Sequence, residues 1–157
     1  MMKTLSFDQA SDCTGVAVFT DNELTKYDLI DLSKQKDTKQ RFLDMIISIN
    51  NYIIAENPDV VVFEDVSLQT NVSTLLLLAQ IQGAIMQSCA IKAIPFKVYK
   101  PTSWRKLLKF TQGRNVKRAE LKQQSKDHVL NKYGLNLKDD ITDAICIGEA
   151  YLIDKNN

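Results

Sequence analysis

The sequence has few of the residues on which zinc sites, disulfide frameworks and membrane anchors depend. It contains one histidine, His128, and three cysteines, Cys13, Cys89 and Cys146, which are odd in number and form no Cys-x-x-Cys pair. A structural zinc site is therefore not expected. We expect instead that the three thiols are reduced and that the protein is cytoplasmic. The first residues, MMKTLSFDQA, lack the long apolar segment of a signal peptide. The most apolar stretch, 75–85, contains two glutamines and is too short to span a bilayer, so no membrane association is predicted.

Glycine and proline are also scarce, with five and three residues respectively in a chain of 157. No glycine-rich nucleotide loop and no flexible linker can be recognised. Hydrophobic residues make up 45% and charged residues 25% of the chain, which excludes a disordered composition. We therefore expect a single domain over residues 1–157 with its own buried core.

The net charge of +1 conceals an uneven distribution of charge along the sequence. Residues 97–132 contain eleven lysines and arginines but only two acids, Glu120 and Asp127, so this segment carries +9 and the rest of the chain −8. A basic block beside an acidic remainder predicts a face that binds a polyanion next to an acidic pocket.

The pattern of hydrophobic residues predicts an α/β fold with a central mixed five-stranded sheet flanked by helices. Three strands come first, followed by helices that alternate with two further strands. The predicted strands are 5–8, 16–19, 26–32, 60–64 and 95–99, and the predicted helices are 40–55, 71–91, 100–109, 116–133 and 139–152.

The helix at 71–91 is apolar nearly all the way round, which predicts burial on every side. We expect one side to contact the sheet and the other a second subunit, giving a homodimer through this helix. The alternative is a central helix that other elements of the same chain cover.

Four acids are candidates for a metal site. Asp8 and Glu64 each end an apolar strand, and Asp140 and Asp143 share one face of the last helix. Their carboxylate oxygens suit Mg²⁺, with Mn²⁺ as a substitute, and could hold two ions for phosphodiester hydrolysis. Each acid taken alone has a structural explanation, such as solvation at a strand end or a favourable position near a helix start. Asp139 competes with Asp140, because it also shares a helix face with Asp143.

Taken together, these segments resemble the RuvC-type Holliday junction resolvases of the RNase H-like superfamily. The similar segments, which cover nearly the whole chain in order, are LSFDQASDCTGVAVF, VVVFEDV, LLLLAQIQGAI and DDITDAICIGEAY. The resemblance implies an RNase H-like fold, a homodimer that cuts two strands of a junction, and a metal site formed by Asp8, Glu64, Asp140 and Asp143. It also implies that Lys117 lies near the scissile phosphate. The compact form is similar to versions carried by bacteriophages, which would place it in the host cytoplasm.

The sequence departs from the family at two places. Gln9 and Ala10 replace the usual Pro-Gly after the first aspartate, so this turn is expected to differ locally. Ser67, followed by Leu68, stands where bacterial members carry an aromatic residue, which predicts a broader preference for branched DNA.

The basic block is interpreted as the DNA-binding surface, because lysines and arginines bind the phosphates of DNA. Such contacts are largely independent of the base sequence. Trp104 is expected to anchor the core, and His128 to lie on a helix surface. The predicted DNA-binding residues are Lys100, Arg105, Lys109, Arg114, Lys117, Arg118 and Lys122.

The leading hypothesis is therefore a Mg²⁺-dependent endonuclease that cleaves Holliday junctions and other branched DNA. Two alternatives remain open: a branched-DNA-binding protein without catalysis, and a phosphotransferase of the actin-like or sugar-kinase type. The short chain and the absence of a glycine-rich loop speak against the phosphotransferase.

Overall fold

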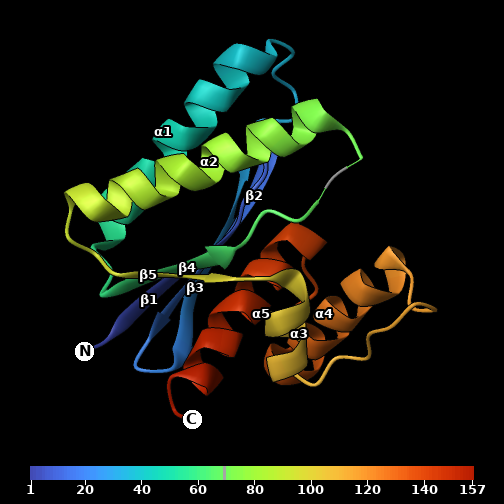
Figure 1. The fold of residues 1–157 in the computed structure, drawn as a ribbon. Helices are drawn as coiled ribbons and strands as arrows, with labels where there is room; N and C mark the ends of the chain where they lie inside the picture. Colours follow the sequence, from blue (N-terminus) through green and yellow to red (C-terminus); the bar gives the residue numbers. More distant parts are fainter. Residues whose placement is uncertain (69) are drawn as a thin grey trace.

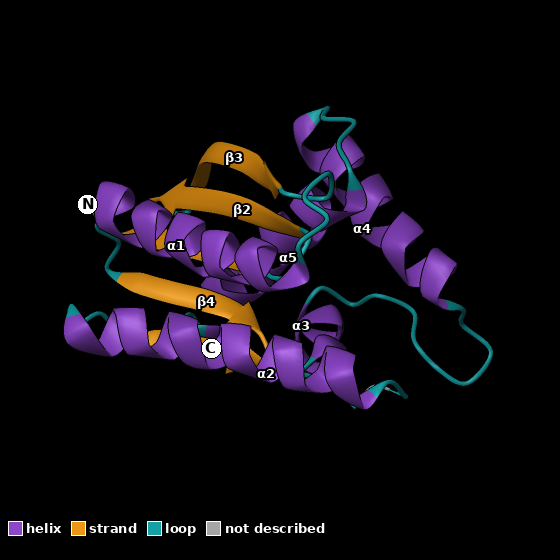
Figure 2. Ribbon diagram, turned by 90° about the horizontal axis from the view of Figure 1, so that it is seen from above, coloured by secondary structure: helices purple, strands orange, loops and turns teal. Residues whose placement is uncertain are grey.

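The computed structural model describes residues 1–68 and 70–157. A five-stranded sheet lies between two layers of helices, with α1 and α2 on one face and α3, α4 and α5 on the other (Figures 1 and 2). The elements in chain order are β1 Lys3–Asp8, β2 Cys13–Thr20, β3 Glu23–Asp31, α1 Thr38–Glu56, β4 Val60–Glu64, α2 Val72–Ile91, β5 Phe96–Tyr99, α3 Pro101–Leu107, α4 Arg118–Tyr133 and α5 Asp139–Asp154. Every predicted strand and helix is present, and β3 begins three residues earlier than predicted.

The sheet has the strand order β3-β2-β1-β4-β5. β1, β2 and β3 form an antiparallel meander, whereas β4 pairs in parallel with β1, and β5 pairs in parallel with β4. The prediction of a mixed five-stranded sheet is thus confirmed. Because β1 and β4 are parallel neighbours, their carboxyl ends lie side by side, which brings Asp8 and Glu64 to the same edge of the sheet.

Helix α5 packs unusually close to the sheet. All ten residues from Ile141 to Ala150 are buried. A Cβ atom on Gly148 would lie 2.3 Å from Cε2 of Phe19 and 2.9 Å from Oγ of Ser6. The Ser6 hydroxyl donates a hydrogen bond of 2.6 Å to the carbonyl of Ala144. The small residues of this helix therefore allow its backbone to rest directly on β1 and β2.

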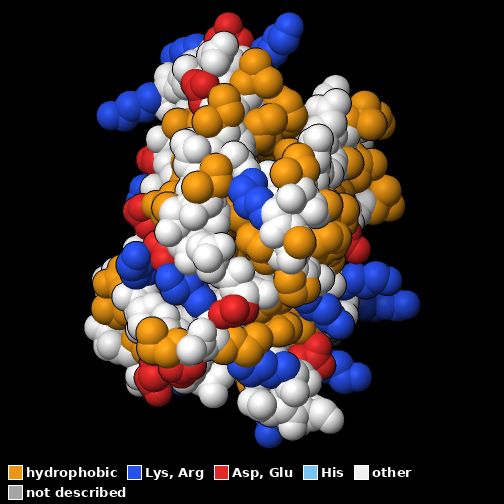
Figure 3. Space-filling model, turned by 90° about the vertical axis from the view of Figure 1, so that its left-hand side faces the viewer, with side chains coloured by type: hydrophobic (Ala, Val, Ile, Leu, Met, Phe, Trp, Pro, Cys, Tyr) orange, Lys and Arg blue, Asp and Glu red, His pale blue; other side chains and the backbone are white. Residues whose placement is uncertain are grey.

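Helix α2 differs from the prediction of burial on every side. Only Ile81, Ile85 and Cys89 of this helix are buried, where it packs against the sheet and α1. The alternative in which other elements of the same chain cover the helix is therefore wrong. Its other residues are exposed or only partly buried, and Figure 3 shows hydrophobic side chains gathered over the part of the molecule formed by α1 and α2. We call this surface the apolar face; its exposed residues are Leu43, Ile47, Ile54, Val72, Leu76 and Ile91.

By length and composition alone, α2 could also cross a membrane. The apolar stretch 75–85 is too short to span a bilayer, but the helix that contains it extends over Val72–Ile91. One such helix is weak evidence for a membrane span, since helices of soluble proteins pass the same test. Its three buried residues belong to the core shared with β1, β4 and α1, so in this fold the helix is part of the domain.

Candidate active site

A cavity of about 610 Å³ opens where β1 and β4 end. Asp8 lies at the last position of β1 and Glu64 at the last position of β4. Both side chains line the cavity together with Asp140 and Asp143 of α5. The structure thus brings together the four acids that the sequence pointed to, although they come from three separate segments of the chain.

Gly15 explains how α5 reaches the end of β1. It pairs with Asp8 in the ladder between β1 and β2. A Cβ atom at this position would lie 1.9 Å from the backbone oxygen of Asp140, so only glycine leaves room for the start of α5. The close approach places Asp140 and, one helical turn later, Asp143 beside Asp8.

Burial raises the pKa of each of the four carboxyls in the cavity, and neighbouring acids add to the effect at three of them. Burial raises the pKa of Asp8 well above its usual value, and the charges of Asp143, Glu64 and Asp140 raise it further. Burial, together with the charge of Glu64, raises the pKa of Asp143 to about 7. The pKa of Asp140 is also raised, by burial and by Asp139. Raised pKa values favour the protonated acids, and a bound cation would favour their ionised form instead.

Asp139 and Asp140 take different positions, which the sequence alone could not decide. Asp139 forms an ion pair with Lys122 of α4, and this hydrogen bond holds its pKa below the usual value in spite of burial. Asp140 lines the cavity, whereas Asp139 is not among the lining residues. Of the two, Asp140 is therefore the candidate for metal binding.

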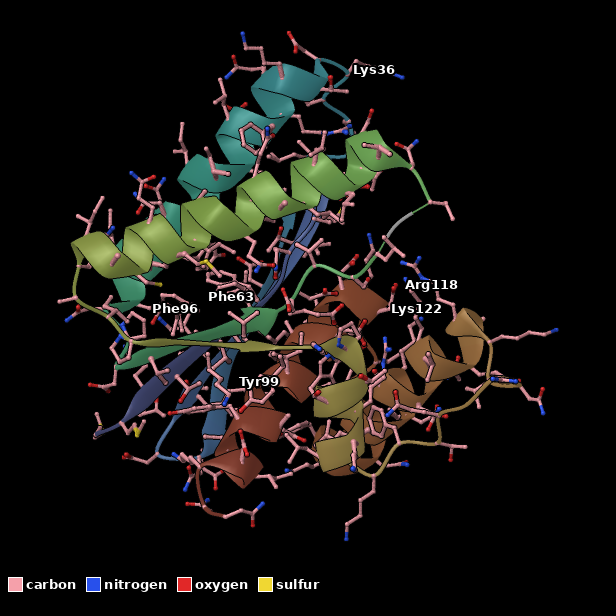
Figure 4. The ribbon with its side chains drawn as sticks, in the orientation of Figure 1. Lys36, Phe63, Phe96, Tyr99, Arg118 and Lys122 are labelled. Carbon is pink, nitrogen blue, oxygen red and sulfur yellow. The ribbon has the colours of Figure 1, made fainter. Side chains whose placement is uncertain are left out.

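Three of the seven predicted DNA-binding residues line the cavity: Arg105 on α3, and Arg118 and Lys122 on α4. Figure 4 shows Arg118 and Lys122 on the side of α4 nearest the start of α5. The other predicted DNA-binding residues are exposed and lie outside the lining of the cavity; they are Lys100, Lys109, Arg114 and Lys117. The backbone N–H of Lys117 donates to the carboxylate of Glu120 over 2.8 Å, at the start of α4.

Three further residues lie at this site although nothing in the sequence predicted that they would. Arg41 of α1 lines the cavity and donates to the backbone oxygen of Gln35 over 3.3 Å, while its Nε has no acceptor among the described residues. Gln9 donates a hydrogen bond of 2.7 Å to the backbone oxygen of Glu64, so the residue that departs from the family pattern ties β1 to β4. Trp104 is fully buried, as predicted, and its indole N–H also donates to Oε2 of Glu64 over 2.8 Å.

His128 does not lie free on the helix surface, which corrects the sequence prediction. Its side chain is 27% exposed, and its Nε2 lies 2.5 Å from Oε2 of Glu149, which is 4% exposed. Glu149 also accepts a hydrogen bond from Tyr133 and lies 3.0 Å from Nζ of Lys132. Although burial raises the pKa of Glu149, these partners hold it below its usual value. This cluster connects α4 to α5 and does not belong to the cavity.

The donor set of the cavity fits a hard divalent cation. One oxygen of the buried Asp143 carboxylate, Oδ1, finds no hydrogen-bond donor in the described part of the chain. Carboxylate oxygens are the ligands that Mg²⁺ and Mn²⁺ prefer. Within residues 1–68 and 70–157, however, no three Asp, Glu, His or Cys side chains are grouped closely enough to hold an ion as they stand. The carboxylates line the same cavity, but their positions do not form a complete set of metal ligands.

Known protein families include one that matches nearly the whole of this chain. The family model described as crossover junction endodeoxyribonuclease RuvC matches residues 4–150. The chain belongs to the RuvC family. A RuvC protein from Nitratidesulfovibrio vulgaris strain Hildenborough is 30% identical over 107 residues, and that from strain DP4 is 29% identical. These alignments cover 66% of this chain and 64% of the length of each relative.

Solved structures share the fold of this RuvC-family chain. RuvC of T. thermophilus in complex with a Holliday junction substrate superposes with a TM-score of 0.77 at 14% identity, over 99% of this chain and 96% of that one. A second Thermus thermophilus RuvC structure gives 0.74 at 15% identity, with the same coverage of both chains. The yeast mitochondrial Holliday junction resolvase Ydc2 gives 0.62 at 13% identity, over 97% and 78% of the two chains. The predicted fold is thus confirmed.

Proposed function

We propose that this chain is a divalent-metal-dependent endonuclease that cleaves Holliday junctions and other branched DNA. One observation carries the proposal: in a RuvC-family chain, the carboxylates of Asp8, Glu64, Asp140 and Asp143 line one cavity whose other wall carries cations. Buried acids with raised pKa values in a cleft are typical of functional sites. The basic wall gives the same cavity affinity for phosphates.

The four acids would hold Mg²⁺, or Mn²⁺ in its place. In this assignment Asp8 would serve both ions, Glu64 and Asp143 would complete their ligand sets, and Asp140 would help to hold one of them. When bound, two such ions supply an activated water and stabilise the leaving oxygen of a phosphodiester. Because the carboxylates are not yet grouped around a common point, we expect their side chains to rotate toward the ions on binding.

The cations of the site position the DNA backbone. Arg105, Arg118 and Lys122 line the cavity, so they would contact the phosphate that is cut and stabilise its developing charge. The exposed cations outside the cavity would contact the flanking phosphates and make binding depend on salt. We place Lys117 in this second group together with Lys100, Lys109 and Arg114.

The apolar face would be covered in a homodimer. Leu76 of α2 is 57% exposed and Ile47 of α1 is 55% exposed, and such large apolar side chains gathered on one surface are typical of interfaces. A two-fold contact through α2 and α1 would give the dimer two cavities, one for each of two strands of a junction. We expect this dimer to act in the cytoplasm, in the host if the chain is encoded by a bacteriophage.

Cleavage of labelled DNA tests the proposal. A four-way junction, a fork, a linear duplex and an RNA–DNA hybrid would each be incubated with Mg²⁺, with Mn²⁺ and with a chelator. We expect metal-dependent cuts near the branch point, with rates at least about 10³-fold lower for Asp8→Asn and Glu64→Gln. Tight junction binding without cleavage under either metal would favour the binding protein, and ATP hydrolysis without DNA the phosphotransferase.

A further inference from the structure

The sequence predicts that Trp104 anchors the core, but its side chain also reaches the candidate metal site. Its side chain is fully buried, yet its one polar atom meets a cavity acid, Glu64, and not the backbone. The indole Nε1 donates a hydrogen bond of 2.8 Å to Oε2 of Glu64. A buried indole N–H needs an acceptor, and here the acceptor is a residue of the candidate metal site.

The surrounding residues hold the indole ring in this orientation. Glu64 pairs with Tyr99 in the ladder between β4 and β5, and α3 begins two residues after Tyr99, so Trp104 comes to lie above the end of β4. The ring of Phe110 meets the indole edge-on, with 6.0 Å between the ring centroids. The guanidinium of Arg105 lies 4.9 Å from the centre of the indole on its face. The donor is thus fixed on several sides.

We propose that Trp104 is the positioning residue for Glu64: its indole N–H holds Oε2, so that Oε1 is the oxygen presented to the metal ion. The inference rests on the proposed function, because it assigns Glu64 to the metal site. A freely rotating glutamate side chain loses conformational entropy when it binds an ion. A fixed hydrogen-bond donor orders the side chain beforehand and so removes part of this cost from ion binding. Trp104 would therefore raise metal affinity without touching the metal or the DNA.

The test compares variants that remove the N–H with one that disturbs only the packing. Trp104→Phe removes the donor and keeps an aromatic ring. Replacement of Trp104 by β-(3-benzothienyl)alanine removes the donor with almost no change of shape, so it covers the case in which Trp104→Phe fails to fold. Phe110→Leu is the matched control, because Phe110 contacts the same indole but makes no hydrogen bond to Glu64 in the structure.

The primary readout is Mn²⁺ binding to the DNA-free protein, measured by calorimetry, and the second is the split between kcat and KM for a junction. Both donor-free proteins are expected to bind Mn²⁺ about 10-fold or more weakly than the wild type, with lower kcat and an unchanged KM. Phe110→Leu is expected to lose thermal stability but keep its Mn²⁺ affinity.

Two results would overturn the inference alone. One is wild-type Mn²⁺ affinity in the benzothienyl protein, and the other is an equal loss of affinity in Phe110→Leu, which would make Trp104 a packing residue only. A wild-type protein that binds no Mn²⁺ would instead overturn the proposed function, and the inference with it.

Discussion

The two apolar helices on opposite faces of the sheet, α2 and α5, differ in the way they meet it. Helix α2 has the more hydrophobic sequence, but it buries only Ile81, Ile85 and Cys89 within the chain. Helix α5 carries several acids, yet buries ten consecutive residues. The depth of burial therefore follows the size of the residues at the contact more closely than their hydrophobicity.

The comparison has a functional meaning. Gly148 of α5, against Phe19 and Ser6, and Gly15 of β2, against Asp140, let α5 approach the sheet until its first turn reaches Asp8 at the acidic cavity. On the other face, α2 has no such close contact at Gly83, where an added Cβ would meet nothing within 4 Å. One helix packs closely enough to bring its acids into the cavity, and the other leaves an apolar surface exposed.

The largest effect is expected from glycines on the α5 side. Gly15→Ala would place a Cβ atom 1.9 Å from the backbone oxygen of Asp140, and neither backbone can give way cheaply. We expect a loss of about 3 kcal/mol or more in the free energy of unfolding, with loss of cleavage, measured by urea denaturation. Gly83→Ala in α2 is the matched control and should stabilise the chain by up to about 1 kcal/mol. Equal effects of the two changes would contradict the comparison.

A second prediction concerns the acid that α5 buries in the cavity. The pKa of Asp143 is raised to about 7 from 3.8, so without metal the folded chain loses stability as the pH rises from about 4 to about 7. Asp143→Asn should therefore abolish cleavage and yet raise the free energy of unfolding of the metal-free protein by about 1–3 kcal/mol at pH 8.

The gain in Asp143→Asn should shrink toward pH 4, where the wild-type carboxyl is protonated in the folded state and begins to be protonated in the unfolded state as well. Chemical denaturation at pH 4, 6 and 8 in the presence of a chelator measures this trend. A variant that is less stable than the wild type at pH 8 would show that Asp143 has a structural role instead.

The α2 side is tested by placing a charge on the apolar face. Leu76→Asp should raise the dissociation constant of the proposed homodimer about 100-fold or more, because an unpaired carboxylate would be buried in the contact. Leu130→Asp is the control, since Leu130 is exposed on α4, on the other face of the sheet. Sedimentation equilibrium measures both. A wild-type protein that stays monomeric at micromolar concentration would remove the dimer from the account.

The smallest effect is expected at Glu149, the second buried acid of α5. Its pKa is lowered, so its contribution to stability is present above about pH 4.5 and is lost as the pH falls through the lower pKa of the folded state. Glu149→Gln should cost about 1–2 kcal/mol at pH 7 and less at pH 3. The free energy of unfolding is thus expected to rise for the substitution at position 143 and to fall for the one at position 149. This difference would distinguish the acid of the cavity from the acid that connects α4 to α5.

Much of the fold could be predicted because it depends on local patterns. Apolar runs that end in Asp8 and Glu64 mark strand ends, and the strand–helix–strand order implies parallel neighbours whose ends meet. The burial of α2 could not be predicted, since a hydrophobic helix looks the same whether its partner belongs to the same chain or to another.

The remaining parts of the site depend on contacts between distant segments. Asp139 and Asp140 both share a helix face with Asp143, and they are told apart by the ion pair of Asp139 with Lys122 and by the position of Asp140 in the cavity lining. The need for glycine at position 15 arises from the backbone of α5, more than a hundred residues later. The hydrogen bond from Trp104 to Glu64 likewise follows from the way β5 and α3 return to β4.

The most direct test of the central claim is anomalous diffraction from crystals of the protein grown with Mn²⁺. The account predicts Mn²⁺ in the cavity, bound by Asp8, Glu64, Asp140 and Asp143, with Asp139 still paired to Lys122. An empty cavity at saturating Mn²⁺, or an ion bound by Asp139 in place of Asp140, would contradict it.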